Sequence, residues 1–249
     1  MKRSLFIMFF ILFVLSPGSY AEQKDPFVIL NKIDSNMTFK SAYSEMEMII
    51  TIKKRKIIKK LKSYSLGNSR SFIEFLSPVR DRGTKILKRD KIIKIYYPSA
   101  ERILRLSGHM LRQSMMGSDM SYEDMTERSN KLREEYSGEM LPDEVLDGEE
   151  CFVLILISKK KRQTYFKRKI WVDKIKYIGL KEELYSKSGK LVKVSKVLNI
   201  KKFNNRFYPV EMIMEDKLRK NSSTRVVLTK IRFNIDIPSE TFSERMLLK

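Results

Sequence analysis

The chain has 249 residues, with 51 Lys or Arg against 30 Asp or Glu, a formal net charge of +21. Charge of this size alone would suggest a nucleic-acid partner. One cysteine excludes an intrachain disulfide, and one histidine with one cysteine excludes the usual zinc clusters and Cys–His pairs. The sequence also lacks a P-loop, a GxSxG elbow and a Rossmann glycine fingerprint. We therefore expect a binding protein with no catalytic residue, cofactor or metal, and not an enzyme.

Residues 1–21 have the pattern of a secretory signal sequence. Lys2 and Arg3 begin it, residues 5–15 are apolar throughout, and Ser19-Tyr20-Ala21 is a small-x-small cleavage pattern. The apolar run is shorter than the ~20 residues that span a bilayer, so we expect cleavage after Ala21; an uncleaved anchor is the alternative. Export to the periplasm favours anionic phospholipid over nucleic acid as the partner of a basic chain. A general abundance of Lys, Ile and Asn is the competing explanation of the charge.

Residues 22–249 are expected to form one domain. Asp25 before Pro26 is a helix N-cap pattern, and the apolar spacing that follows predicts a helix to about residue 37. The period then changes to two, because Met46 to Ile52 alternate with polar residues, which predicts a half-buried strand. Further strands are expected at 57–66, 70–76, 84–89, 91–97, 102–106, 130–137, 151–158, 163–173, 177–186, 190–199, 207–215 and 224–234.

Turn sequences separate these strands and crossover helices are missing. The turns are Pro98-Ser99-Ala100-Glu101, Asp147-Gly148, Ser188-Gly189 and Asn204-Asn205. Evenly spaced strands with local turns predict a mainly β fold, an antiparallel sheet that curls on itself. Cys151 lies in an apolar run and is expected to be buried.

One polar and apolar stretch lies between the strands expected up to residue 106 and those expected from residue 130. It reads Gly117-Ser118-Asp119-Met120-Ser121-Tyr122-Glu123-Asp124-Met125, and the spacing of Ser121 and Asp124 is nearly a capping box, which predicts a short helix. The stretch resembles the Gly-Ser/Thr-Asp-aromatic-Ser-Tyr-Glu-Asp-Leu signature of LolA-like outer-membrane lipoprotein-sorting proteins. Other stretches resemble the family in the expected order: Leu76 to Leu87, Tyr96-Tyr97-Pro98 with Arg102, Asp147 to Cys151, Trp171-Val172-Asp173, Gly189 to Lys193, and Phe233-Asn234 with Phe242 and Leu247.

The resemblance implies a monomeric periplasmic carrier that shields lipid chains in an incomplete antiparallel β-barrel, with short helices forming a lid. Met120 and Met125 stand where the family more often has an aromatic residue and a leucine, and Tyr177-Ile178-Gly179 lacks an expected proline. Such a carrier would take a lipoprotein from an inner-membrane transporter toward the outer membrane. The alternatives are a lipid-binding adaptor or shuttle of a resistance-nodulation-division type exporter, and a structural envelope protein.

Apolar residues on the early strands are the candidates for a lipid cavity: Met46, Met48, Ile50, Ile52, Phe72 and Phe75. Five methionines in or beside the signature are the candidates for a lid over residues 108–126: Met110, Met115, Met116, Met120 and Met125. Gly108 and Gly117 would be its hinges. Methionine adapts to chains of varied shape, so the cluster suits lipid. The competing interpretation of both sets is ordinary core packing.

The polar signature residues are interpreted as structural and not catalytic: Gly117, Ser118, Asp119, Ser121, Tyr122, Glu123 and Asp124. Two basic runs, 53–56 with Lys59 and Lys60, and 159–162, are expected at solvated hairpin tips, or else as a docking patch for anionic membrane or a transporter. The acidic stretch 134–150 is expected to be a hairpin that protects a sheet edge. His109 is expected at the surface.

Overall fold

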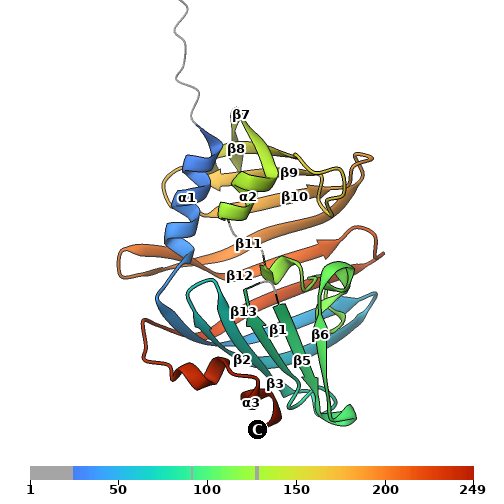
Figure 1. Ribbon diagram of the computed structural model, residues 1–249. Coiled ribbons are helices and arrows are strands. Elements are labelled where there is room, and N and C mark those ends of the chain that lie inside the picture. The colour runs from blue at the N-terminus through green and yellow to red at the C-terminus, as the bar shows by residue number, and fades with distance from the viewer. Residues whose placement is uncertain (1–24, 91, 127–128) are drawn as a thin grey trace, which may run out of the picture.

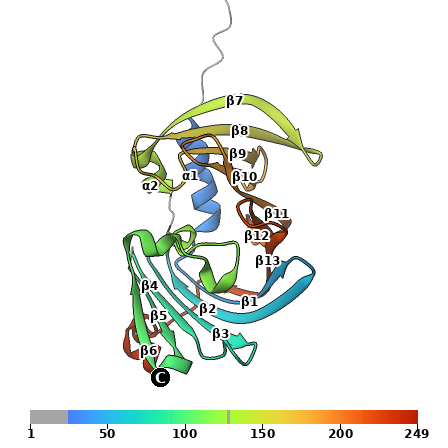
Figure 2. The same cartoon turned by 90° about the vertical axis from the view of Figure 1, so that its right-hand side faces the viewer.

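The computed structural model describes residues 25–90, 92–126 and 129–249, and in them thirteen strands form one antiparallel sheet. The strand order is β6-β5-β4-β3-β2-β1-β13-β12-β11-β10-β9-β8-β7, so only β1 and β13 pair out of chain order. Figure 2 shows the sheet curving like a letter C, with β7 at one tip and β6 at the other. The mainly β fold with an unclosed, strongly curved sheet is therefore confirmed.

The strands keep the order expected from the alternation of the sequence. Their bounds are β1 Ser41–Ile52, β2 Arg55–Leu66, β3 Arg70–Ser77, β4 Lys85–Arg89, β5 Ile92–Tyr97, β6 Arg102–Leu106, β7 Tyr136–Leu146, β8 Glu149–Ser158, β9 Lys167–Asp173, β10 Gly179–Tyr185, β11 Leu191–Phe203, β12 Arg206–Asp216 and β13 Ser222–Phe233. The four expected turns each join two consecutive strands. Asp147, Asn204 and Gly189 adopt positive φ there, as hairpin turns require.

The helices are short and few. They are α1 Pro26–Met37, α2 Ser129–Glu135 and α3 Arg245–Leu248, with 3-10 turns η1 Pro98–Ala100, η2 Gly108–Arg112, η3 Met115–Gly117, η4 Asp124–Thr126 and η5 Ser239–Phe242. The Asp25 side chain accepts the N–H of Phe27 at 2.8 Å, so the predicted N-cap of α1 is confirmed. Among the described residues, no helix is both long and apolar enough to cross a membrane.

One predicted strand is wrong. Residues 130–137 were expected to be extended, yet α2 occupies Ser129–Glu135 and β7 begins only at Tyr136. Leu132, Arg133, Glu134 and Glu135 all favour helix, and Leu132 packs with the apolar residues of α1. The short alternation around Leu132 could not show that its partner is a helix.

α1 lies inside the C of the sheet, against its β7–β9 end (Figures 1 and 2). Ile29 and Leu30 of α1 are buried with Leu154, Leu156 and Val172 of β8 and β9. The opposite, outer face of β3 and β4 is covered by the C-terminal residues, where Phe242 and Leu247 pack on Phe72 and Leu87. Helix α1 therefore covers the inner face at one end of the sheet, and the C-terminal residues cover the outer face at the other end.

The expected signal sequence, residues 1–21 with cleavage after Ala21, lies outside the described residues. Cys151 is fully buried, as expected from its apolar neighbours. The acidic stretch forms the β7–β8 hairpin, and β7 is indeed an edge strand of the sheet. The edge-protecting interpretation of that hairpin therefore agrees with its place in the fold.

Candidate functional site

Residues 108–126 cross the inner face of the sheet near its β6 end, as the green segment in Figure 2 shows. Their side chains join one apolar cluster with the strands beneath. Its buried members are Met48, Ile50, Leu61, Ile73, Phe75, Ile86, Ile93, Ile95, Leu106, Met115 and Tyr122. Half-buried residues around it include Met46, Ile52, Met110, Leu111, Met116, Met120, Met125 and Val226. The segment therefore covers a continuous apolar surface.

Five of the six proposed cavity residues share this cluster: Met46, Met48, Ile50, Ile52 and Phe75. The structure places Phe72 elsewhere, because it packs on the outer face with Leu87, Phe242 and Leu247. Phe72 and Phe75 are three residues apart on β3, and successive side chains of a strand point to opposite faces. Phe72 is therefore not part of the inner surface.

The five methionines of the segment do not occupy equivalent positions. Met115 is only 5% exposed and belongs to the buried core, whereas Met110, Met116, Met120 and Met125 are half-buried around it. Met115 thus has the place of an ordinary core residue. Of the other four, Met116 and Met125 each line a cavity.

A cavity of about 330 Å³ opens beside Met116, between the segment and the β5–β6 end of the sheet. Its apolar wall comes from Ile95, Leu104, Leu106 and Met116. Lys59 and Asp81 line another wall and form an ion pair with Nζ 2.7 Å from Oδ2, both side chains being almost fully buried. Cavities of this size lie at the lower end of the range for small-ligand sites.

The position of Lys59 corrects an expectation. The sequence predicts that Lys59 lies with its basic neighbours at a solvated hairpin tip. The β1–β2 turn consists of Lys53 and Lys54, however, and Lys59 lies within β2. Lys59 is 2% exposed, because it shares the inward phase of Leu61 on β2. The strand period could have shown this, whereas its partner Asp81 could be found only from the fold. The second basic run, 159–162, is exposed between β8 and β9 as expected.

A second cavity, of about 320 Å³, lies at the other end of the segment, beside Met125. Phe39, Tyr208 and Phe233 form one wall, with the rings of Phe39 and Phe233 stacked 3.6 Å apart between centroids. Lys88 lines the cavity as well, and its Nζ donates to the carbonyl of Met125 at 2.6 Å. These aromatic residues come from three separate places in the sequence, so periodicity within one strand could not bring them together.

A row of half-buried apolar residues continues the inner face across β13, β12 and β11. The register places Met48 opposite Val226, Val226 opposite Met212, and Met212 opposite Val197. Directly opposed residues point to the same face of a sheet. The apolar inner face thus extends from β1 to β11, toward the end that α1 covers.

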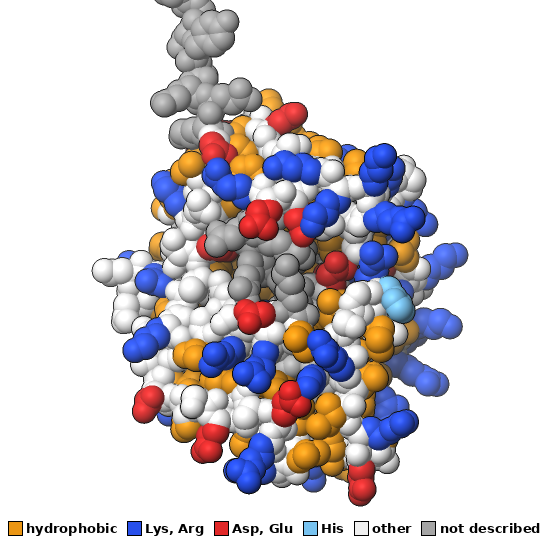
Figure 3. Space-filling model, in the orientation of Figure 1, with side chains coloured by type: hydrophobic (Ala, Val, Ile, Leu, Met, Phe, Trp, Pro, Cys, Tyr) orange, Lys and Arg blue, Asp and Glu red, His pale blue; other side chains and the backbone are white. Residues whose placement is uncertain are grey.

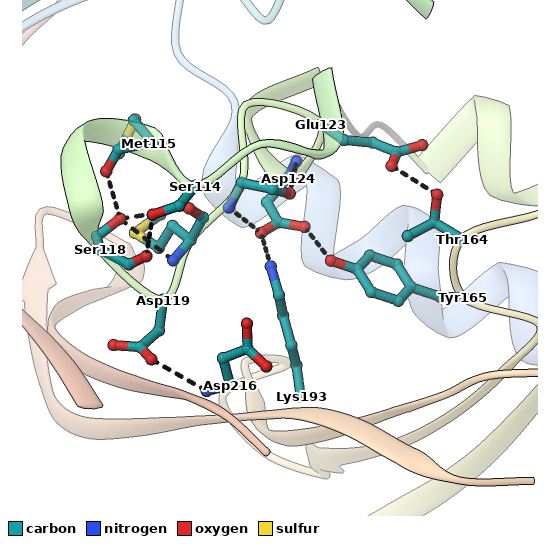
Figure 4. A network of polar contacts seen from close by, with 12 residues as sticks. Ser114, Met115, Ser118, Asp119, Glu123, Asp124, Thr164, Tyr165, Lys193 and Asp216 are labelled. Carbon is teal, nitrogen blue, oxygen red and sulfur yellow. Dashed lines mark hydrogen bonds and ion pairs between the residues drawn. The ribbon is translucent and has the colours of Figure 1, made fainter. Parts of the chain in front are cut away.

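The signature residues attach the covering segment to this face, as Figure 4 shows. Ser121 and Asp124 form the predicted capping box: the Ser121 N–H donates to Asp124 Oδ2 at 2.7 Å, and the Asp124 N–H donates to Ser121 Oγ at 3.3 Å. Asp124 also forms an ion pair with Lys193 of β11 at 2.7 Å and accepts the hydroxyl of Tyr165 at 2.7 Å. The capping-box prediction is confirmed. The same carboxylate also joins the segment to Lys193 and Tyr165, which are distant in sequence.

Asp119 and its neighbours make a second attachment. The Asp119 carboxylate, 1% exposed, accepts the hydroxyl of Thr224 at 2.6 Å and the N–H of Asp216 at 3.3 Å. Arg219 donates to the carbonyls of Ser118 and Gly117 at 2.7 and 3.2 Å. Glu123 accepts the hydroxyl of Thr164 at 2.7 Å. All these polar groups are satisfied by structural contacts, which fits their interpretation as anchors.

Two further titratable side chains of the covering segment, Tyr122 and His109, have different surroundings. Burial, and then the neighbouring Tyr97, raises the pKa of the Tyr122 phenol, so it stays protonated. His109 is exposed in η2, and Figure 3 shows the single histidine in pale blue at the surface. Within the described residues, no group of three or more His, Cys, Asp or Glu side chains could hold a metal ion.

This curved, open sheet with a covered apolar inner face defines the LolA-like fold. A LolA superfamily protein from Nitrosomonas europaea has it with a TM-score of 0.71 and 26% identity, over 88% of this chain and 97% of that one. The chain belongs to the family whose model, described as that of an uncharacterized protein, matches residues 67–249, and it has the LolA-like fold.

Two other solved structures are similar over nearly the whole chain. A DUF1329 family protein from Desulfovibrio piger has a TM-score of 0.82 and 25% identity, covering 89% of this chain and 97% of that one. An outer membrane lipoprotein-sorting protein domain from Vibrio parahaemolyticus shares the fold with a TM-score of 0.80 and 24% identity, covering 90% and 98%. No curated protein matches the chain significantly.

Proposed function

We propose that the protein is a periplasmic carrier, which holds the acyl chains of lipids or lipoproteins on its inner face, beneath residues 108–126. It would receive a lipoprotein from an inner-membrane transporter and carry it toward the outer membrane, by binding alone and without a covalent step. The observation that carries the proposal is the cover itself. A methionine-bearing segment lies across an apolar face, and a cavity opens beneath it at Met116.

The energetics of lipid transport explain why a cover is needed. Each exposed methylene costs about 0.8 kcal/mol, so an acyl chain crosses water only when its surface is buried. The two cavities, of about 330 and 320 Å³, lie beside Met116 and Met125. The apolar row from Met48 to Val197 lies on the same inner face. The row and the apolar walls of the two cavities offer several apolar surfaces on the inner face, against which parts of a flexible chain could lie.

The attachment of the cover suggests which part moves. Polar contacts hold residues 117–124 to β11, β12 and β13. Residues 110–116 meet the sheet mainly through apolar side chains, including Met110, Leu111 and Met116. Met116 and Gly117 have positive φ at the junction of the two parts. Backbone hydrogen bonds also join the two parts, as from the Glu123 N–H to the Leu111 carbonyl at 2.7 Å, so we infer that the half-buried side chains of the first part shift to admit a chain while the backbone stays attached.

Native mass spectrometry of protein purified from its own periplasm tests the proposal. Co-purified diacylglyceryl peptides are expected for a lipoprotein carrier. Free phospholipid or another amphiphile would favour an adaptor or shuttle of a resistance-nodulation-division type exporter. Protein that carries no lipid, and binds none when offered it, would leave a structural envelope role and contradict the proposal.

A paired substitution tests the position of the site. Met116→Asp places a carboxylate in the cavity wall and should abolish binding of a fluorescent acyl probe, because burying a charge against hydrocarbon is costly. Val79→Asp is the matched control, since Val79 is 79% exposed. Equal binding by both variants, with unchanged unfolding curves, would show that the chain binds elsewhere.

A further inference from the structure

The two edges of the sheet differ in how they are protected. β7 carries Pro142 and a bulge between Leu141 and Glu144, both of which interrupt pairing with a further strand. β6 has neither feature: its five residues pair with β5 in unbroken register, from Tyr97 opposite Arg102 to Ile93 opposite Leu106. β6 is short, but its outer edge is regular.

The outer edge of β6 is open. β6 is the terminal strand of the sheet, and within the described residues its backbone pairs with β5 and with no other segment. Its apolar side chains are also accessible, Ile103 being 38% and Leu104 41% exposed. A regular edge of this kind can accept an added strand through backbone hydrogen bonds.

Positive charge lies on both faces of the edge, because Arg102 and Arg105 are three residues apart on β6. After the hydrogen bond from Lys94, Arg105 also helps to lower the pKa of the Glu244 carboxyl. Arg102 and Arg105 lie on β6 and are exposed, as is Arg112 in η2, which follows β6. None of these three arginines has an ion-pair partner among the described residues. Arg80 lines the cavity, and its Nε lies 3.8 Å from Oδ1 of Asp81, which is a long distance for an ion pair.

The cavity beside Met116 adjoins the same strand. Leu104 and Leu106 of β6 line it, with Ile95 of β5. A strand added along β6 would direct alternate side chains toward this inner face. Strand addition takes affinity from the backbone bonds and specificity from pockets that receive alternate side chains. The edge and the cavity together provide both.

We propose that the β6 edge is a docking site for a partner protein, which adds an extended segment as a further strand. Acidic residues of that segment would lie opposite Arg102 and Arg105, one on each face of the sheet, and the apolar residue opposite Leu104 would meet the cavity wall. A second copy of this chain fits poorly. Two β6 strands would bring four arginines and no carboxylate to the pairing, and β7 is interrupted by its bulge and proline. The proposal does not require lipid binding.

Hydrogen exchange and binding measurements on the purified protein test it. The probe is a short capped peptide with the sequence Val-Glu-Val-Val-Glu, which places its glutamates opposite Arg105 and Arg102 in an antiparallel pairing, and its control is the same peptide with lysine for glutamate. We expect the glutamate peptide to slow exchange of the amides of residues 102–106. Arg102→Glu with Arg105→Glu should weaken binding by about tenfold or more, since charges at the rim guide association.

The matched control variant is Lys201→Glu with Lys202→Glu, an exposed basic pair near the end of β11, and it should bind the glutamate peptide like the unmodified protein. Equal binding of the lysine peptide, equal loss in both variants, or protection of a different segment would overturn the proposal. Concentration-dependent association that protects residues 102–106 without peptide would also overturn it, because a second copy would then occupy the edge.

Discussion

Asp119 and Thr224 are 105 residues apart in sequence and exchange two buried hydrogen bonds. The N–H of Asp119 donates to Thr224 Oγ1 at 2.8 Å, and that hydroxyl donates to Asp119 Oδ2 at 2.6 Å. Both residues are about 1% exposed. This reciprocal pair fixes the covering segment to β13, and it explains why an acidic residue follows the serine of the signature.

Thr224→Val should test this attachment, because valine keeps the shape but removes both hydrogen bonds. We expect a loss of about 1–3 kcal/mol in the free energy of unfolding, since Asp119 would lose partners in a buried site. The amides of residues 117–121 should also exchange faster. Thr229→Val is the control, because the Thr229 hydroxyl donates to the Glu45 carbonyl from an exposed position. Equal losses in the two variants would contradict the anchoring role.

Lys193→Met should be more damaging than an ordinary lysine substitution. It leaves the Asp124 carboxylate buried without its cation, and breaking a buried pair from one side costs about 3–5 kcal/mol. Lys196→Met, at an exposed position on the same strand, should change stability by less than about 0.5 kcal/mol. Chemical denaturation measures both. Adding Asp124→Asn to Lys193→Met should recover part of the loss; no recovery would mean that the pair is not the cause.

Met115 and Met116 should respond differently to the same change. Met115→Ala should lower the free energy of unfolding by about 2–5 kcal/mol, because Met115 is a buried core residue. Met116→Ala should cost less stability yet weaken acyl-probe binding, because Met116 lines the cavity. Thermal unfolding and probe titration of the two variants separate core from site. The reverse pattern would remove Met116 from the proposed site.

Gly138 allows α1 to approach β7 closely. A Cβ added there would lie 2.7 Å from Pro26 Cγ and 3.0 Å from Leu156 Cδ2, so Gly138→Ala should displace the start of α1 and cost about 1–3 kcal/mol. Gly179→Ala is the control, because its Cβ would meet only Ile170 Cγ2 at 4.0 Å. Denaturant unfolding should show the difference. Equal stability of the two variants would mean that α1 adjusts freely.

Asp173 should make stability depend on acid pH. Burial by itself raises the pKa of its carboxyl, but hydrogen bonds from the Lys176 side chain and from the N–H groups of Lys176 and Ile175 outweigh it and lower the pKa below 3.8. A lowered folded pKa gives stability that is present above the unfolded pKa and lost as the pH falls through the folded value.

Asp173→Asn should therefore destabilise by about 1–3 kcal/mol near neutral pH, and the difference from the unmodified protein should shrink below about pH 4. Urea unfolding across that range measures it. Asp236→Asn, at an exposed position, is the control and should show little effect at any pH. A difference that grows on acidification would mean that the pKa shift has the opposite sign.

Much of the fold could be read from local patterns. The alternation from Met46 to Ile52, the Asp25-Pro26 start of α1 and the Ser121–Asp124 capping box each depend on neighbours within a few residues, and each is found where expected. The segment 130–137 failed because helix and strand were nearly balanced locally, and Leu132 met α1. Phe72 lies on the outer face because it is three residues from Phe75 and therefore in the opposite phase of the strand.

The sequence by itself determined the order of most strands, the turns that join them, and the segment that carries the methionines, since these follow from the two-residue period and from turn chemistry. Only the tertiary structure decided that β1 pairs with β13, that Asp81 meets Lys59, and that Asp119 meets Thr224. These contacts join residues far apart in the chain. Their partners are selected by the curvature of the whole sheet, which no local pattern contains.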